Sequence, residues 1–387
     1  MTRGDETPQE PEVLLTRSGR LGLVTLNRPR ALNALNHAMV RAVHAALRAW
    51  AADPAVATVA ITGAGERGLC AGGDIRAIHR DATSGAADAG AASAAFWRDE
   101  YRLNAAIARF PKPYVALMDG IVMGGGVGLS AHGTHRVVTE RSRVAMPETG
   151  IGFAPDVGGT WLLARAPGEL GTHLALTGGE MTAGDAHYCG FADHLVPAEA
   201  LPALLADLAE TPADRAVAAH AGPVPPAALA EARGWIDPCY AADTVEEILA
   251  RLAARPEPAA RVTARHLLTR SPTSLKVTLA AVRRARRLAT LEEALEQEYR
   301  VSRALLASPD LVEGVRARVV DKDRAPRWRP AALAEVTGAD VAGYLAAPEG
   351  DEGLGLTPAG GPPAGGPPVA GPPAGDPLTD GPSAAAG

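Results

Sequence analysis

Cysteine and aromatic residues are scarce in this 387-residue chain, and each scarcity narrows the range of folds. Only 4% of the residues are aromatic, so alanine and branched aliphatic side chains must fill the interior. The three cysteines, Cys70, Cys189 and Cys239, lie far apart and match no metal-ligand spacing. They predict neither a disulfide framework nor a metal site, and a reducing intracellular compartment is expected.

The chain also lacks a surplus of positive charge and an apolar leader. Lysine and arginine total 38 against 44 acidic residues, a formal charge of −6, which argues against a nucleic-acid-binding protein. The first 13 residues are polar and acidic, so no secretory signal is expected. The apolar stretch 114–131 contains Asp119 and several glycines, which a membrane-spanning helix tolerates poorly. We therefore expect a cytoplasmic protein that binds neither nucleic acid nor membrane.

Composition divides the chain into four predicted parts. Residues 1–11 form a flexible N-terminus, residues 12–212 a core with the active site, and residues 213–345 a helical region. The last part, 346–387, is rich in proline, glycine and alanine. From residue 351 onward it holds 9 Pro, 10 Gly and no Lys or Arg, so it cannot bury a core and is expected to be disordered.

Strand-like and helix-like segments alternate in the core, which indicates an α/β fold. Four β-rich runs are predicted to be strands: 20–27, 56–63, 114–120 and 134–140. The segments 34–52 and 89–110 between them are predicted to be helices. The helical region contains three helix starts: Ser271 before Pro272, Thr290 with Glu293 as a capping box, and Ser308 before Pro309.

Three glycine-rich segments carry the chemical signal: GLCAGGDIRAI (68–78), MDGIVMGGGVGLS (118–130) and AMPETGIGFAPDVGGT (145–160). Glycine allows close backbone approach and an unrestricted φ, so two such loops can direct peptide N–H groups at one oxygen. A pair of this kind stabilises negative charge on a carbonyl, and removing one donor costs about 3–4 kcal/mol of transition-state binding. Tight turns and helix packing are the alternative explanation for any single glycine.

Other motifs are absent or arise by chance. Gly126, Gly128 and Ala131 match a dinucleotide fingerprint, but Glu148 at the acidic position follows a proline rather than a strand. The chain contains no phosphate-binding loop of the GxxxxGK type and no GxSxG nucleophile elbow. The pair His132 and His135 lacks the HExxH context of a zinc site, so no metal is expected.

The sequence resembles the crotonase, or enoyl-CoA hydratase/isomerase, superfamily. Four motifs carry this resemblance: LNRPRALNALN (26–36), CAGGDI (70–75), MGGGVGLS (123–130) and MPETGIGFAPDVGGTWLLAR (146–165). Four further segments are similar to the branch that hydrolyses 3-hydroxyisobutyryl-CoA in valine breakdown: 96–104, 174–196, 271–278 and 313–333. The resemblance covers residues 12–340 and implies a spiral of ββα turns followed by C-terminal helices.

The resemblance also implies a site. The thioester carbonyl would lie between the N–H groups of Gly73 and Gly125, with Glu148 as the catalytic carboxylate. Asp156 would assist Glu148, and Glu100 would line the substrate pocket, although a carboxylate in a charged helix is usually solvated. The resemblance places CoA along five residues: Ala31, Ala71, Gly72, Asp74 and Ile75. No metal or redox cofactor is required, because CoA is part of the substrate. Trimer-based assemblies are common in this superfamily, so a homo-oligomer is left open.

One departure from the superfamily pattern favours hydrolysis over hydration. Hydratases place a second glutamate three residues after the middle glycine of the turn, and this chain has Gly128 there. One carboxylate suffices for thioester hydrolysis, with Glu148 acting as a nucleophile or as a base toward water. Two alternatives remain: an enoyl-CoA hydratase or isomerase, and a non-catalytic acyl-CoA-binding protein.

Overall fold

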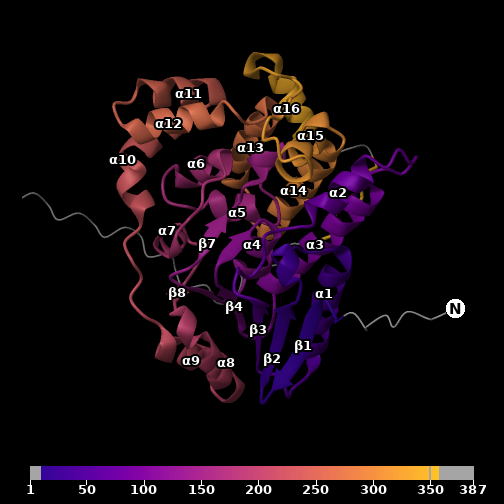
Figure 1. The fold of residues 1–387 in the computed structure, drawn as a ribbon, viewed down its shortest axis with the longest axis vertical. Helices are drawn as coiled ribbons and strands as arrows, with labels where there is room; N and C mark the ends of the chain where they lie inside the picture. The colour runs from indigo at the N-terminus through magenta and orange to yellow at the C-terminus, as the bar shows by residue number, and fades with distance from the viewer. Residues whose placement is uncertain (1–9, 348–349, 357–387) are drawn as a thin grey trace, which may run out of the picture.

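The computed structural model describes residues 10–347 and 350–356 of the chain. A six-stranded sheet occupies one end of the molecule, with strand order β1-β2-β3-β4-β6-β8 (Figure 1). Its strands are β1 (Val13–Ser18), β2 (Leu21–Leu26), β3 (Thr58–Gly63), β4 (Tyr114–Met118), β6 (His135–Val138) and β8 (His194–Leu195). Only the β1–β2 pair is antiparallel; the other neighbours are parallel. Parallel neighbours need crossover connections, and helices lie in several of them.

A second, two-stranded sheet pairs β5 (Ile121–Met123) with β7 (Arg143–Ala145). Cys70 extends it by a bridge to Val122. Each turn of the chain therefore contributes first to the large sheet and then to the small one. The three turns run from β3 to Cys70, from β4 to β5, and from β6 to β7. This arrangement is the predicted spiral, and it confirms the α/β fold class.

The two faces of the large sheet are covered by different helices. Alternate residues of a strand point to opposite faces, and β3 illustrates this: Val59 and Ile61 lie in the core that includes α1 (His37–Ala52) and α3 (Ala91–Ala108), whereas Ala60 lies in the other core. That second core is closed by α8 (Leu201–Glu210) and α9 (Ala213–His220). β1, β5, β7 and β8 are strands that the sequence analysis did not anticipate.

The remaining helices surround the second sheet and extend away from the first (Figure 1). They are α2 (Ile75–Ala82), α4 (Gly125–Ser130), α5 (Gly159–Leu163), α6 (Leu170–Thr177), α7 (Ala183–Tyr188), α10 (Ala228–Tyr240), α11 (Val245–Ala254), α12 (Pro258–Leu267), α13 (Pro272–Ala285), α14 (Leu291–Leu306), α15 (Pro309–Val315) and α16 (Gly338–Leu345). Short 3-10 turns lie at η1 (Pro29–Ala31), η2 (Glu148–Ile151), η3 (Ala198–Ala200) and η5 (Leu333–Glu335), and a π-helical turn, η4, at Arg316–Val320.

The three predicted helix starts are confirmed. Ser271 caps α13 through a bond from the Ser274 N–H, and Thr290 forms the capping box of α14 with Glu293. Helix α15 begins at Pro309, although Ser308 makes no side-chain capping bond. No helix within the described ranges is long and apolar enough to cross a bilayer.

The packed part of the chain extends into the segment that was predicted to be a disordered tail. Arg303 of α14 donates a 2.6 Å bond to Asp351, and the N–H of Leu354 bonds to Glu296 on the same helix. The Leu354 side chain is fully buried. Residues 350–356 therefore pack against α14, because two charged anchors and one leucine offset the low hydrophobicity of the segment. The rest of the predicted tail, 348–349 and 357–387, and residues 1–9 lie outside the described residues.

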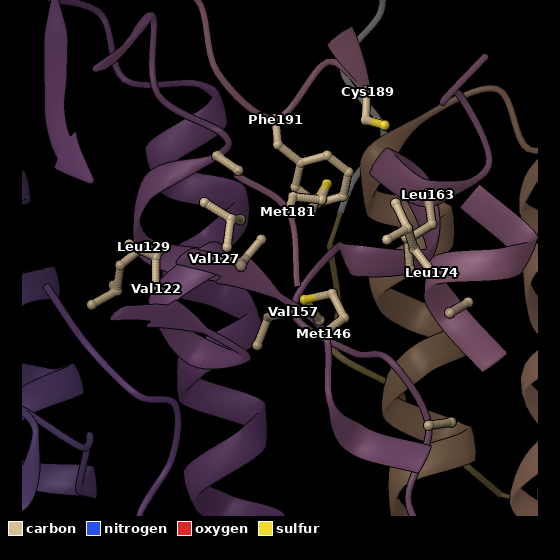
Figure 2. Close-up of a cluster of buried hydrophobic side chains, with 14 of the residues drawn as sticks. Val122, Val127, Leu129, Met146, Val157, Leu163, Leu174, Met181, Cys189 and Phe191 are labelled. Carbon is tan, nitrogen blue, oxygen red and sulfur yellow. The ribbon is translucent and has the colours of Figure 1, made fainter. Parts of the chain in front are cut away.

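A hydrophobic cluster lies beside the glycine-rich segments (Figure 2). Val122 and Val127 come from β5 and α4, while Leu163 and Leu174 come from α5 and α6. Met146 and Val157 lie between these two groups. The segment that joins them, 146–157, carries both predicted catalytic acids, so its two ends are anchored in the core.

Candidate active site

The two predicted oxyanion loops lie against each other. A Cβ placed on Gly72 would lie 3.7 Å from the Gly125 nitrogen, and one placed on Gly124 would lie 3.6 Å from the Gly72 Cα. Gly72 and Gly124 have φ values of +103° and +48°, which favour glycine. Within the described chain, the N–H groups of Gly73 and Gly125 donate no hydrogen bond. Both groups are therefore free to bind an external acceptor.

Three carboxyl groups are buried next to these loops. Glu148, Asp156 and Glu100 are 6%, 6% and 2% exposed. A Cβ on Gly124 would lie 2.9 Å from Glu148 Oε1, and one on Gly125 would lie 2.5 Å from Glu100 Oε1. The structure thus brings the predicted acids and the predicted amide donors together. It also shows that Glu100 is buried, whereas its charged surroundings in the sequence are typical of a solvated residue.

Burial and mutual repulsion make these acids retain protons. Burial, followed by the negative charge of Asp156, raises the pKa of both Glu148 and Glu100 well above the ordinary value. Burial raises the pKa of Asp156 to about 7, although a hydrogen bond from Tyr101 opposes that rise. Near neutral pH the cluster therefore holds both ionised and protonated carboxyl groups, so it can supply a nucleophile or base together with an acid.

Two of the acids also present unused polar atoms. Glu148 Oε2 and Glu100 Oε1 are buried and accept no hydrogen bond from the described residues. Unpartnered buried carboxylate oxygens are costly in a structural role. They are typical of a site that completes its hydrogen bonds with a substrate.

Asp156 is held by residues that the sequence analysis missed. The Tyr101 hydroxyl donates a 2.7 Å bond to Asp156 Oδ2 and lies 2.7 Å from the Ser302 Oγ. One turn before Ser302, Glu298 accepts bonds from the N–H groups of Gly158 and Thr160, at 2.6 and 2.8 Å. Helix α14 therefore holds the Asp156 loop directly through Glu298 and indirectly through the Ser302–Tyr101 contact.

A helical periodicity could have revealed part of this support. Trp97, Glu100, Tyr101 and Asn104 recur at i, i+3, i+4 and i+7 on α3, which defines one face of a helix. All four are buried, and Trp97 stacks on Phe153 with ring centroids 5.2 Å apart. That face forms a wall beside the carboxyl cluster.

The predicted CoA-contacting residues lead from the surface toward the cluster. They are Ala31, which is exposed; Ala71, Asp74 and Ile75, which are half-buried; and Gly72, which is buried. Backbone bonds from Ala71 N to Leu32 O (3.0 Å) and from Leu35 N to Gly72 O (2.8 Å) join their two segments. Asp74 itself caps α2 and binds Arg28 at 3.2 Å. Its carboxylate therefore has a structural partner already.

Gly128 lies where a hydratase carries its second glutamate, and the surrounding side chains close this position. A Cβ on Gly128 would lie 2.7 Å from the Val157 Cβ and 2.8 Å from Asn104 Nδ2. Both distances are shorter than real Cβ contacts allow. A longer side chain here would require the neighbouring residues to move.

Other reactive residues nearby have ordinary structural roles. Burial raises the pKa of the Cys70 thiol to about 12, which opposes a nucleophilic role. His132 Nε2 lies 2.8 Å from the Val157 carbonyl oxygen, and His135 Nε2 lies 2.7 Å from Asp214. The two histidines thus contact separate partners. A surface hollow of about 740 Å³ lies elsewhere, between α14 and α16, and no predicted site residue lines it.

Comparisons with known proteins identify the family. The sequence profile described as enoyl-CoA hydratase/isomerase matches residues 21–345. The chain belongs to this family. One relative within the enoyl-CoA hydratase/isomerase family is a rat protein named 3-hydroxyisobutyryl-CoA hydrolase, mitochondrial. It is 45% identical over 345 residues, which cover 86% of this chain and 88% of the relative.

Two solved structures of the family are similar over nearly their whole length. A carnitinyl-CoA dehydratase from Mycobacterium thermoresistibile is 55% identical with a TM-score of 0.85, covering 89% of this chain and 98% of that one. An enoyl-CoA hydratase from Rhodobacter sphaeroides is 45% identical with a TM-score of 0.82, covering 87% and 97%. These structures confirm the crotonase fold.

The prediction of a cytoplasmic location is wrong. The rat relative is named mitochondrial, and so are the relatives from Xenopus tropicalis and human. The prediction depended on the polar first residues and the lack of an apolar leader. That criterion detects secretory signals, but it does not detect amphipathic mitochondrial targeting segments.

Proposed function

We propose that this protein hydrolyses 3-hydroxyisobutyryl-CoA to 3-hydroxyisobutyrate and free CoA, a reaction of valine breakdown. The observation that carries the proposal is the closed position at Gly128, which leaves Glu148 without the second water-holding carboxylate of a hydratase. The name of the rat relative, at 45% identity, supports the same reaction.

The proposed reaction starts with polarisation of the thioester carbonyl. The N–H groups of Gly73 and Gly125 donate to the carbonyl oxygen and stabilise the oxyanion that forms there. CoA lies along Ala31 and the 71–75 loop, which leads from the surface to these donors. Glu148 Oε1 lies beside Gly124, the residue that precedes Gly125, and this proximity supports an acyl carbon within reach of Glu148.

Glu148 then acts in one of two ways to release the product, 3-hydroxyisobutyrate. In the first, a Glu148 oxygen attacks the acyl carbon, the C–S bond breaks, and water later hydrolyses the mixed anhydride. In the second, Glu148 takes a proton from a water molecule as that water attacks the same carbon. In both routes the leaving CoA thiolate takes up a proton, and protonated Asp156 is the donor. Asp156, whose pKa is raised to about 7, is partly protonated at neutral pH, whereas the raised pKa of Glu148 requires that group to lose its proton before either route begins.

Hydration of an enoyl-CoA is the second candidate, because the titles of the two similar structures name a dehydratase and a hydratase. Hydration adds water across a C=C bond and releases no thiol. The two reactions are therefore separated by one experiment with two readouts.

The experiment supplies 3-hydroxyisobutyryl-CoA and a conjugated enoyl-CoA to the protein, and follows thiol release and loss of the conjugated absorbance. We expect thiol release from the first substrate, and a loss of about 10³-fold in kcat in Glu148→Gln because the carboxylate is removed. Glu199→Gln is the matched control, since Glu199 is exposed on η3. Loss of conjugation without free thiol would contradict hydrolysis and favour the hydratase.

A further inference from the structure

A buried arginine lies behind the turn that carries Glu148. Arg270, between α12 and α13, is only 7% exposed. Its Nη2 donates a 2.8 Å bond to the Thr177 carbonyl oxygen, while Nε and Nη1 are buried and have no hydrogen-bond partner within the described ranges. A buried charged group normally requires a partner, because desolvation of the charge is costly.

A second arginine approaches the same place. A Cβ on Gly150 of the η2 turn would lie 2.8 Å from Arg270 Nη1, 3.6 Å from Arg270 Cζ and 3.8 Å from Arg318 Cζ. The guanidinium groups of Arg270 and Arg318 therefore both lie beside Gly150, and glycine is the residue that admits Arg270 Nη1 this close to the turn. Neither arginine forms an ion pair with an acidic residue of the described chain.

A second pair of converging arginines in this chain is neutralised by a carboxylate. Arg283 of α13 and Arg286 at the C-cap of that helix also converge, and Glu169 lies between them with 2.8 Å ion pairs to each. Such a carboxylate is missing between Arg270 and Arg318. The contrast indicates that the Arg270–Arg318 pair is arranged for a negatively charged group that the described chain does not supply.

The neighbouring histidine does not supply the negative charge. His266 Nε2 lies 2.6 Å from Arg270 Nη2, and burial together with the charge of Arg270 lowers the pKa of His266. The imidazole is therefore neutral near pH 7. Burial and the charge of Arg318 lower the pKa of Arg270 to about 10, so its guanidinium remains charged at neutral pH.

We propose that Arg270 and Arg318 form a binding site for a small oxyanion, a carboxylate or a phosphate, behind the η2 turn. Both groups accept paired hydrogen bonds from the planar guanidinium fork. Arg318 is exposed, so the anion reaches the site from solvent, and Arg270 then binds it in the interior. Glu148 Oε1 faces Gly124, so that oxygen belongs to the proposed active site rather than to the arginine pair.

Binding of inorganic phosphate and of acetate to the full-length protein tests the site. Each anion is titrated separately at constant ionic strength, by calorimetry and by the shift in thermal unfolding temperature. We expect saturable binding of at least one anion at millimolar concentration, and a loss of affinity of about tenfold or more in Arg318→Met. Whichever anion binds, phosphate or acetate, identifies the chemical class of the ligand.

Matched variants keep the test decisive. Arg318→Met is the primary variant because Arg318 is exposed and its loss leaves the core intact; Arg270→Met should abolish binding where it folds. Arg215→Met on α9 removes an exposed arginine outside this cluster and should leave the affinity unchanged. Saturable binding of neither anion, or equal affinity in Arg318→Met and wild type, would overturn the site. The readout is binding rather than turnover, so the outcome does not depend on the proposed hydrolase reaction.

Discussion

Replacing Asp156 by asparagine should make the folded protein more stable at alkaline pH while it lowers the thioesterase activity. Asp156 is a buried acid beside two other acids, and burial raises its pKa from 3.8 to about 7. The folded state then keeps a proton that the unfolded chain has already released. Ionised Asp156 consequently destabilises the folded state, and asparagine has nearly the same shape without the charge.

The sign and size of the effect follow from this difference. Below pH 3.8 both states are protonated, and the carboxyl group costs nothing. As the pH rises toward 7, the unfolded state is increasingly favoured, and above 7 the full cost of about 4 kcal/mol is present. Asparagine avoids that cost but weakens the charge-assisted bond from Tyr101. We therefore expect a net gain of about 2–4 kcal/mol in unfolding free energy at pH 8, and almost none at pH 4.

Urea unfolding at pH 4 and pH 8 measures both values, with thiol release measured on the same samples. Asp88→Asn is the matched control, because Asp88 is exposed and is not one of the three clustered acids; it should change stability at neither pH. A variant at Asp156 that is destabilised equally at both pH values would refute the reasoning. It would mean that Asp156 is a structural hydrogen-bonding residue whose charge is well tolerated.

Two further substitutions test the glycine positions. Gly125→Ala should lower kcat by about 10²–10³-fold with little change in KM, because its Cβ would lie 2.5 Å from Glu100 Oε1 and displace the amide donor. Steady-state thiol release measures kcat, and an unchanged value would exclude Gly125 from the oxyanion hole. Gly128→Ala should lower the unfolding free energy by about 1–3 kcal/mol in urea titrations, because its Cβ would overlap Val157, and an equal or higher stability would show that the position is open.

Local sequence signals predicted much of the fold because they act over a few residues. Proline after serine and the Thr290–Glu293 pair mark helix starts through bonds within one turn, and the structure has helices there. β-rich runs likewise predicted four strands of the large sheet. The three-residue strands β5 and β7 were not anticipated, because they depend on pairing with each other across the spiral rather than on local composition.

The site shows the same division between local and long-range information. The motifs that resemble the crotonase superfamily singled out Glu148 and Asp156 by position. They gave no indication of Tyr101, Ser302 or Glu298, because a contact across 55 residues places Tyr101 against Asp156 and one across 201 residues places Ser302 against Tyr101. Residues that hold a predicted catalytic group in place carry no motif of their own, and only the packing of the helices reveals them.

The choice between hydrolysis and hydration is connected to the backbone strain at Val157. This residue follows Asp156 and has a φ of +53°, a conformation that is costly for a β-branched side chain. Its side chain fills the space that Gly128 leaves open, at a point where a hydratase would hold a second carboxylate. Val157 thus links two features: it follows Asp156 directly in the chain, and its side chain occupies the space beside Gly128. Replacing Gly128 by glutamate alone should therefore fail to create a hydratase, because Val157 must move first, and any movement of Val157 also displaces Asp156.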